Sequence, residues 1–178
     1  AHLSDIHVGG AMNRERLRRV AELTLAAKPD VVLHTGDFLT HRSGDFDLPL
    51  YEALATIEAP YGQWASLGNH DFDDVSQFTR RLRDAGVTTL RDRTATLLIE
   101  GQPLELAGLD FAFRRESLAE YYAALTRGWV REGAPRILLN HEPSSFYELP
   151  EGIADLVLSG HTHGGHIGVQ LTRDSALT

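Results

Sequence analysis

Side chains that can bind metal ions follow five separate apolar runs of this sequence. Each run ends, within a few residues, in Asp, Asn or His, and several of these residues stand beside a glycine. The nine candidates are Asp5, His7, Asp37, Asn69, His70, Asp71, His141, His161 and His163. Imidazole and carboxylate are common ligands of divalent metals such as zinc, iron and manganese, so the pattern indicates metal chemistry.

Asp37 is well suited to join two ions, because the two oxygens of a carboxylate can bind different metals. Asp5 and His7 are two residues apart, as are His161 and His163, so each pair points the same way if the chain is extended. Two divalent ions, two carboxylates and one hydroxide would leave roughly one net positive charge, which suits an anionic substrate such as a phosphate ester. Ions about 3.5–4 Å apart can bind the attacking and the leaving oxygen together.

The rest of the sequence alternates between strand and helix patterns. The expected strands are 1–4, 31–35, 62–67, 136–140, 154–159 and 167–171, and the expected helices are 13–28, 48–57, 75–85 and one that begins near Ser117. Two apolar runs on either side of Glu100-Gly101-Gln102-Pro103 predict an antiparallel hairpin. This order favours a layered α/β domain with mixed sheets.

The candidates stand at the carboxyl ends of these strands. In open α/β sheets, ligands bind beyond the carboxyl ends, because parallel neighbours bring those ends to one rim. Gly36, Gly68 and Gly160 directly precede candidates. Since glycine permits close approach of the backbone, the sequence predicts one compact site at this rim.

The ordered motifs resemble those of the calcineurin-like metallophosphoesterase superfamily. They are Asp-x-His at 5–7, Gly-Asp at 36–37, Gly-Asn-His-Asp at 68–71, a single His141, and Gly-His-Thr-His at 160–163. Each motif alone is a weak signal, since each could be an ordinary turn or strand terminus. Five motifs in this order, from residue 5 to residue 163, form a specific signal.

The resemblance implies an α/β fold, an αββα sandwich of two mixed β-sheets flanked by helices, with a dinuclear metal site at the C-terminal ends of the strands. It implies one ion bound by Asp5, His7, Asp37 and His163, and a second bound by Asp37, Asn69, His141 and His161. A hydroxide bridging the ions would be the nucleophile. His70 would assist the leaving group, and Asp71 would orient His70. The ions would be manganese, iron or zinc, among which the ligands do not choose.

The segment Gly-His-Thr-His-Gly-Gly at 160–165 resembles a bacterial branch that is often membrane-associated. That branch contains phosphodiesterases and a pyrophosphatase that acts on a UDP-linked diacylglucosamine. His166 follows here, where Gln is usual in the branch. The resemblance implies a phosphodiesterase, phosphomonoesterase or pyrophosphatase. The expected partner is a small phosphate ester or phosphodiester, with nucleotides and lipid-linked diphosphates among the candidates.

Two rival functions remain at this point. One is a binding scaffold of the same fold without catalysis, which the complete ligand set and His70 argue against. The other is a mononuclear metal hydrolase of a non-phosphate substrate, which Asp37 and the second set of ligands argue against. Bound metal together with turnover separates the enzyme from the scaffold, and a metal-to-protein ratio near two would exclude the mononuclear hydrolase. His34 lies within a buried strand and is expected to be a core histidine rather than a ligand.

The length, composition and net charge of the chain exclude further classes of protein. The chain has 178 residues, which suits a single domain, and we expect residues 1–178 to be one, trimmed at one or both ends. It has no cysteine, so thiol catalysis and zinc–cysteine sites are excluded. The net charge of −8 argues against nonspecific nucleic-acid binding. No apolar run reaches the length of a membrane span, and the expected location is the cytoplasm or the membrane periphery.

Overall fold

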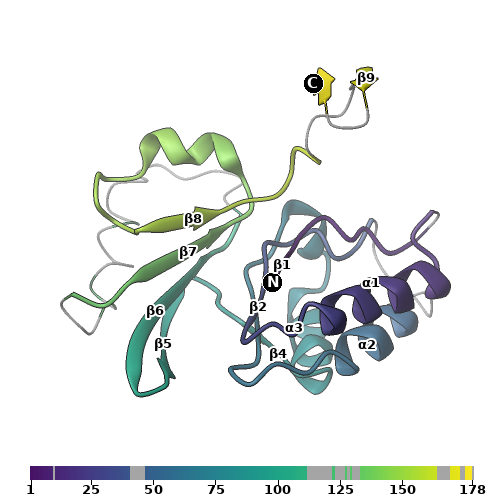
Figure 1. Ribbon diagram of the computed structural model, residues 1–178, viewed down its shortest axis with the longest axis horizontal. Helices are drawn as coiled ribbons and strands as arrows, with labels where there is room; N and C mark the ends of the chain where they lie inside the picture. The colour runs from purple at the N-terminus through teal and green to yellow at the C-terminus, as the bar shows by residue number, and fades with distance from the viewer. Residues whose placement is uncertain are drawn as a thin grey trace.

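The computed structural model describes residues 1–9, 11–40, 47–111, 122, 127, 129, 133–163, 169–172 and 175–177, the last two ranges by their backbone alone. Two four-stranded sheets lie beside each other, and three helices cover the first one (Figure 1). The two glycines after His163, His166 and the helix expected from Ser117 lie outside the described residues. The predicted α/β fold with two sheets and flanking helices is confirmed.

The first sheet contains β1 (His2–Leu3), β2 (Val32–His34), β3 (Gln63–Ala65) and β4 (Val87–Thr89), in that order. Its three pairings are all parallel, with Leu33 between His2 and Trp64. Only the second sheet is mixed, whereas both were expected to be. Strand β4 was not expected, because Val87-Thr88-Thr89 is not an apolar run like those that predicted the other strands of this sheet.

Helices α1 (Arg14–Ala26), α2 (Leu48–Ala55) and α3 (Val75–Asp84) pack against the first sheet. Side-chain caps begin two of them: Asn13 accepts from the backbone N–H of Arg16, and Asp74 accepts from that of Gln77. Such caps satisfy N–H groups that the first helical turn leaves unpaired. Buried Leu and Phe side chains from all three helices join Val32 and Ala65 of the sheet in one core.

The second sheet contains β5 (Arg93–Ile99), β6 (Gln102–Leu109), β7 (Arg136–Asn140) and β8 (Leu156–Leu158). The β5–β6 pair is antiparallel, and the other two pairings are parallel. The hairpin is confirmed, but its turn has two residues, Glu100 and Gly101, because Gln102 and Pro103 already pair in β6. Both turn residues have positive φ, as a type I′ turn requires. Strands β9 (Val169–Thr172) and β10 (Ser175–Leu177) form a separate antiparallel pair.

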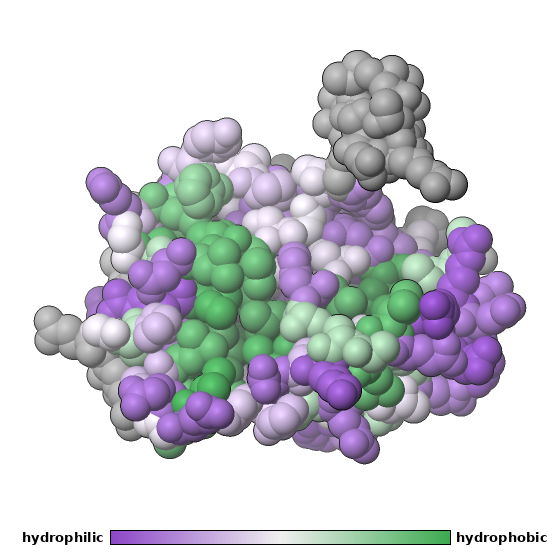
Figure 2. Space-filling model, viewed as in Figure 1, coloured by the Kyte–Doolittle hydropathy of each residue, from purple (hydrophilic) through white to green (hydrophobic). Residues whose placement is uncertain are grey.

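Side chains alternate between the two faces of the second sheet. Leu106 and Leu139 belong to a core shared with Leu33 of the first sheet, while Ala107 and Leu138 belong to a second core with Tyr122. Apolar surface gathers over the second sheet in the view of Figure 2, whose left side corresponds to that sheet in Figure 1. In the part of the chain that the structure describes, no helix has the length and apolar character to cross a bilayer.

Candidate metal centre

The nine candidate residues lie just beyond the carboxyl ends of β1, β2, β3, β7 and β8. Eight described non-glycine residues have positive φ, and five of them are candidates: Asp5, His7, Asp37, His161 and His163. The left-handed region is uncommon for non-glycine residues and clusters at functional sites. The chain is therefore not extended at Asp5 and His7, and both side chains reach the site from left-handed backbone.

Asp5, His7 and His163 form the first group of potential ligands, with one ligand atom of each within 4.8 Å of the others. Nε2 of His7 lies 3.1 Å from Nε2 of His163, which lies 3.4 Å from Oδ1 of Asp5. The backbone N–H of His161 donates to both oxygens of Asp5, at 2.9 and 3.1 Å, and so fixes the plane of that carboxylate. Residues from opposite ends of the sequence thus meet in one cluster.

Asp37, His141 and His161 form a second group, with ligand atoms again within 4.8 Å of one another. Oδ2 of Asp37 lies 3.2 Å from Nε2 of His141 and 3.4 Å from Nε2 of His7. Burial would raise the pKa of Asp37, but the hydrogen bonds from His141 and from the backbone of His70 lower it. Asp37 therefore presents a carboxylate oxygen to both groups, as the bridging role requires.

The donor atoms suit divalent cations. Nδ1 of His7 faces the carbonyl of Leu39 at 3.1 Å, and Nδ1 of His141 faces that of Thr35 at 2.6 Å. A carbonyl only accepts, so each Nδ1 carries a proton. When the ring is neutral, its lone pair is then on Nε2, the nitrogen that faces Asp37 and the site. Burial lowers the pKa of His7, which favours the neutral ring. Burial also opposes charge on His141, but the bond and charge of Asp37 outweigh it and raise its pKa.

Asn69 supplies the most direct sign of a missing partner. Its Oδ1 is buried and has no hydrogen-bond partner among the residues that the structure describes. A buried polar atom without a partner costs about 1–3 kcal/mol, so it calls for an explanation such as an ion. The expected ligand set includes this amide, and its oxygen is a ligand that manganese accepts. The residues present therefore fit two divalent ions.

Asp71 has a structural role that the sequence did not reveal. Its carboxylate is almost fully buried and accepts backbone N–H bonds of 2.9–3.3 Å from four residues, Asp37, Phe38, Leu39 and Gly68. Burial and the nearby charge of Asp37 raise the pKa of Asp71 to about 7, although the amide bonds favour the ionised form. Asp71 thus ties the loop after β2 to the loop after β3. Its expected role in orienting His70 stays a prediction.

His70 belongs to the loop after β3 and lies beside His7 and Asp37. Its backbone N–H donates to Oδ1 of Asp37 at 3.0 Å, and its ring centroid lies 5.1 Å from that of His7. A ring nitrogen falls within 4.8 Å of ligand atoms on His7 and Asp37. His70 is close enough to act on a group bound to the ions, and its ring could also supply a ligand atom.

Two polar residues that support the ligands were missed. Ser4 Oγ donates to Oδ2 of Asp5 at 2.5 Å, and Glu142 Oε2 lies 3.2 Å from Nε2 of His161. Both stand next to a predicted ligand in the sequence, which was the available signal. His34, by contrast, is the predicted core histidine: it is 1% exposed and bonds Oε1 of Gln63 at 3.1 Å.

Three glycines allow the loops to approach each other. A Cβ atom on Gly36 would lie 2.7 Å from Cα of Gly68, and one on Gly160 would collide with Ser4 and Asp5. A Cβ on Gly68 would lie 2.5 Å from the backbone nitrogen of Asp37. Real side chains do not tolerate such distances, so the site requires glycine at these places.

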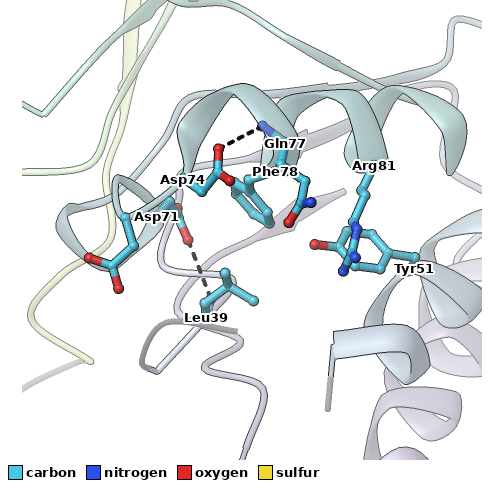
Figure 3. A pocket seen from close by; sticks show the side chains of 8 residues that line it. Leu39, Tyr51, Asp71, Asp74, Gln77, Phe78 and Arg81 are labelled. Carbon is cyan, nitrogen blue, oxygen red and sulfur yellow. Dashed lines mark hydrogen bonds between the residues drawn. The ribbon is translucent and has the colours of Figure 1, made fainter. Parts of the chain in front are cut away.

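A cavity of about 270 Å³ borders the site on the side of α2 and α3 (Figure 3). Its described lining consists of Leu39, Tyr51, Asp71, Asp73, Asp74, Gln77, Phe78 and Arg81. The guanidinium of Arg81 stacks over Tyr51, 5.7 Å from the ring centre. Of the nine candidates only Asp71 is among these residues, so none of the seven predicted metal ligands belongs to the described lining of the cavity.

Comparison with known proteins agrees with this geometry. The family model described as calcineurin-like phosphoesterase matches residues 1–165. The metallophosphoesterase YkoQ of Bacillus subtilis is 30% identical over 93% of this chain and 61% of its own length. The phosphodiesterase YaeI of Escherichia coli is 26% identical over 95% of this chain and 62% of its own length. The chain thus spans less than two thirds of either relative.

A solved structure shows the same fold. The 5′-nucleotidase precursor of Thermus thermophilus matches 91% of this chain and 41% of its own, with a TM-score of 0.58 and 17% sequence identity. At this identity the likeness concerns the arrangement of the two sheets and their flanking helices. The fold expected from the strand and helix pattern is therefore found in an independently determined protein.

Proposed function

Because this chain belongs to the calcineurin-like phosphoesterase family, we propose that it hydrolyses phosphoric esters with two divalent metal ions bound at the rim of its sheets. The observation that carries the proposal is Oδ2 of Asp37, which lies within 3.4 Å of His7 in one ligand group and of His141 in the other. When bound, the ions would activate a water as nucleophile and offset charge on the phosphoryl oxygens. Manganese, iron and zinc all suit these ligands.

The residues of this chain would share the work as follows. Asp5, His7, Asp37 and His163 would hold one ion, and Asp37, Asn69, His141 and His161 the other. Asp71 and the glycines would keep the loops at fixed distances, so that the ligand atoms need little rearrangement. His70 would donate a proton to the leaving oxygen or stabilise charge that develops on the phosphoryl group. The relative YaeI is named as a phosphodiesterase, which supports testing a diester first.

A pair of chromogenic substrates tests the proposal. Purified chain is assayed on bis-p-nitrophenyl phosphate and on p-nitrophenyl phosphate, with and without added manganese. We expect manganese-dependent release of nitrophenol that is lost on chelation. The ratio of the two rates shows whether the site prefers diesters or monoesters. A nucleotide and a lipid-linked diphosphate are then assayed as further substrates. Two bound ions without turnover on any of these would contradict the proposal and favour a binding scaffold.

A further inference from the structure

The ring of His161 has different surroundings at its two nitrogens. Nδ1 lies 3.2 Å from Nε2 of His141, inside the group that includes Asp37. Nε2 points the other way and lies 3.2 Å from Oε2 of Glu142. We propose that Glu142 is a positioning residue, which holds the proton of His161 on Nε2 and thereby directs the Nδ1 lone pair to the second ion.

The chemistry of the pair supports this orientation. An ionised carboxylate accepts hydrogen bonds and does not donate them, so a neutral His161 must place its single proton on the nitrogen that faces Glu142. The opposite nitrogen is then left with a lone pair. Carboxylates that bind the remote N–H of a metal-binding histidine fix the ring and increase its basicity, and their loss typically costs 10- to 100-fold in metal affinity or activity.

Glu142 is itself held in place. Its side chain caps the short 3₁₀ helix η3 (Pro143–Glu148), because it accepts from the backbone N–H of Ser144 at 3.1 Å. Its backbone carbonyl accepts from Asn140 Nδ2 at 2.8 Å and from Ser145 Oγ at 2.7 Å. The carboxylate therefore reaches His161 from a fixed point directly after the ligand His141.

His161 differs in this respect from two other predicted ligands. The remote nitrogens of His7 and His141 face backbone carbonyls, of Leu39 and Thr35, which no substitution removes. The remote nitrogen of His161 faces a side chain. Substitution of Glu142 is therefore expected to weaken the binding of the second ion only. Asp5, His7 and His163, the predicted ligands of the first ion, do not depend on this contact.

The inference rests on the proposed dinuclear function, and manganese titration by calorimetry tests the two separately. Wild type is compared with Glu142→Asn, Glu142→Ala and the control Glu148→Gln. Asn remains a good helix cap but is too short to reach His161, while Ala loses both contacts. Glu148, exposed at the end of the same helix, controls for the loss of one negative charge. We expect about 10- to 100-fold weaker binding of one ion in both Glu142 variants and wild-type binding in the control.

The outcomes separate the claims. If Glu142→Asn binds both ions like wild type, Glu142 only caps the helix and the inference is wrong, even if Glu142→Ala is weakened. A wild-type chain that binds fewer than two ions contradicts the proposed function instead. In that case, long-range ¹H–¹⁵N NMR of the metal-free chain still tests the role of Glu142, because it shows which ring nitrogen of His161 carries the proton. A proton on Nε2 of His161 in wild type, redistributed in Glu142→Asn, supports the role, and a proton on Nδ1 in wild type overturns it.

Discussion

Substitution of Gly68 by alanine should separate the geometry of the site from its chemistry. Gly68 carries no functional group and has an ordinary extended backbone, with φ −94° and ψ 177°. An added Cβ would nevertheless lie 2.5 Å from the nitrogen of Asp37 and closer still to its Oδ1. The loop after β2 or the loop after β3 must then move, and this changes the position of the Asp37 carboxylate relative to the other predicted ligands.

The loss of folding stability caused by Gly68→Ala can be estimated. Overpacking by one methyl group typically costs about 1–3 kcal/mol, and backbone on the opposing side leaves little room for relaxation. For a chain of this size, that loss corresponds to a fall in melting temperature of roughly 2–12 °C. Because the displaced atoms include both oxygens that touch His7, His141 and His70, metal binding should weaken by tenfold or more, the loss associated with misplaced ligand support.

Gly86→Ala is the matched control. Gly86 has φ +85°, and nothing lies within 4 Å of an added Cβ. Left-handed backbone costs alanine about 1–2 kcal/mol, so this variant should lose similar stability without any collision. Thermal unfolding of the metal-free chains and manganese titration are measured on both. The reasoning fails if Gly68→Ala binds two ions as tightly as Gly86→Ala does.

Three other substitutions test separate steps. His70→Ala should retain both ions and lose about 100-fold or more in turnover of a diester with a poor leaving group, as expected for loss of an acid catalyst; unchanged turnover would reject that role. Asp71→Asn places an amide against backbone N–H donors, so the free energy of unfolding of the metal-free chain should fall by about 2 kcal/mol or more in denaturant titrations. A wild-type value would show that the amide contacts do not matter. Burial lowers the pKa of His34 from 6.5 to about 4. As the pH falls, the His34 ring therefore binds a proton in the unfolded chain at a higher pH than in the folded chain. Wild type loses stability as the pH falls from about 6.5 to about 4. The stability difference between wild type and His34→Gln should therefore shrink by up to about 3 kcal/mol between pH 7 and pH 4, and parallel pH curves would contradict this account.

The rim and its candidate ligands could be predicted because strand ends and metal-binding residue types are both visible in the sequence. Asp37 follows a short apolar strand after a glycine, and His141 follows another. Parallel pairing brings strand ends to one edge within each sheet. Asp37 follows a strand of the first sheet and His141 a strand of the second, so their meeting also requires the two sheets to pack with these ends together. The hairpin near Gly101 was equally predictable, since a short segment that contains Gly and Pro separates two apolar runs.

Other features could not be predicted, because they depend on contacts between distant backbone segments. The carbonyls of Thr35 and Leu39, which fix two histidine rings, belong to residues whose types carry no signal. The four amide bonds of Asp71 join two loops, and only the folded structure brings these loops together. The left-handed backbone at Asp5 and His7 is likewise imposed by neighbouring segments, against the intrinsic preference of both residues.

The most direct test of the central claim is the ratio of metal to protein. Wild type and Asp37→Asn are loaded with manganese, passed through a desalting column and measured by elemental analysis. The account predicts about two ions per wild-type chain and a clear loss in Asp37→Asn, because one oxygen of Asp37 serves both ligand groups. One ion or none in wild type, or two in Asp37→Asn, would contradict the dinuclear centre.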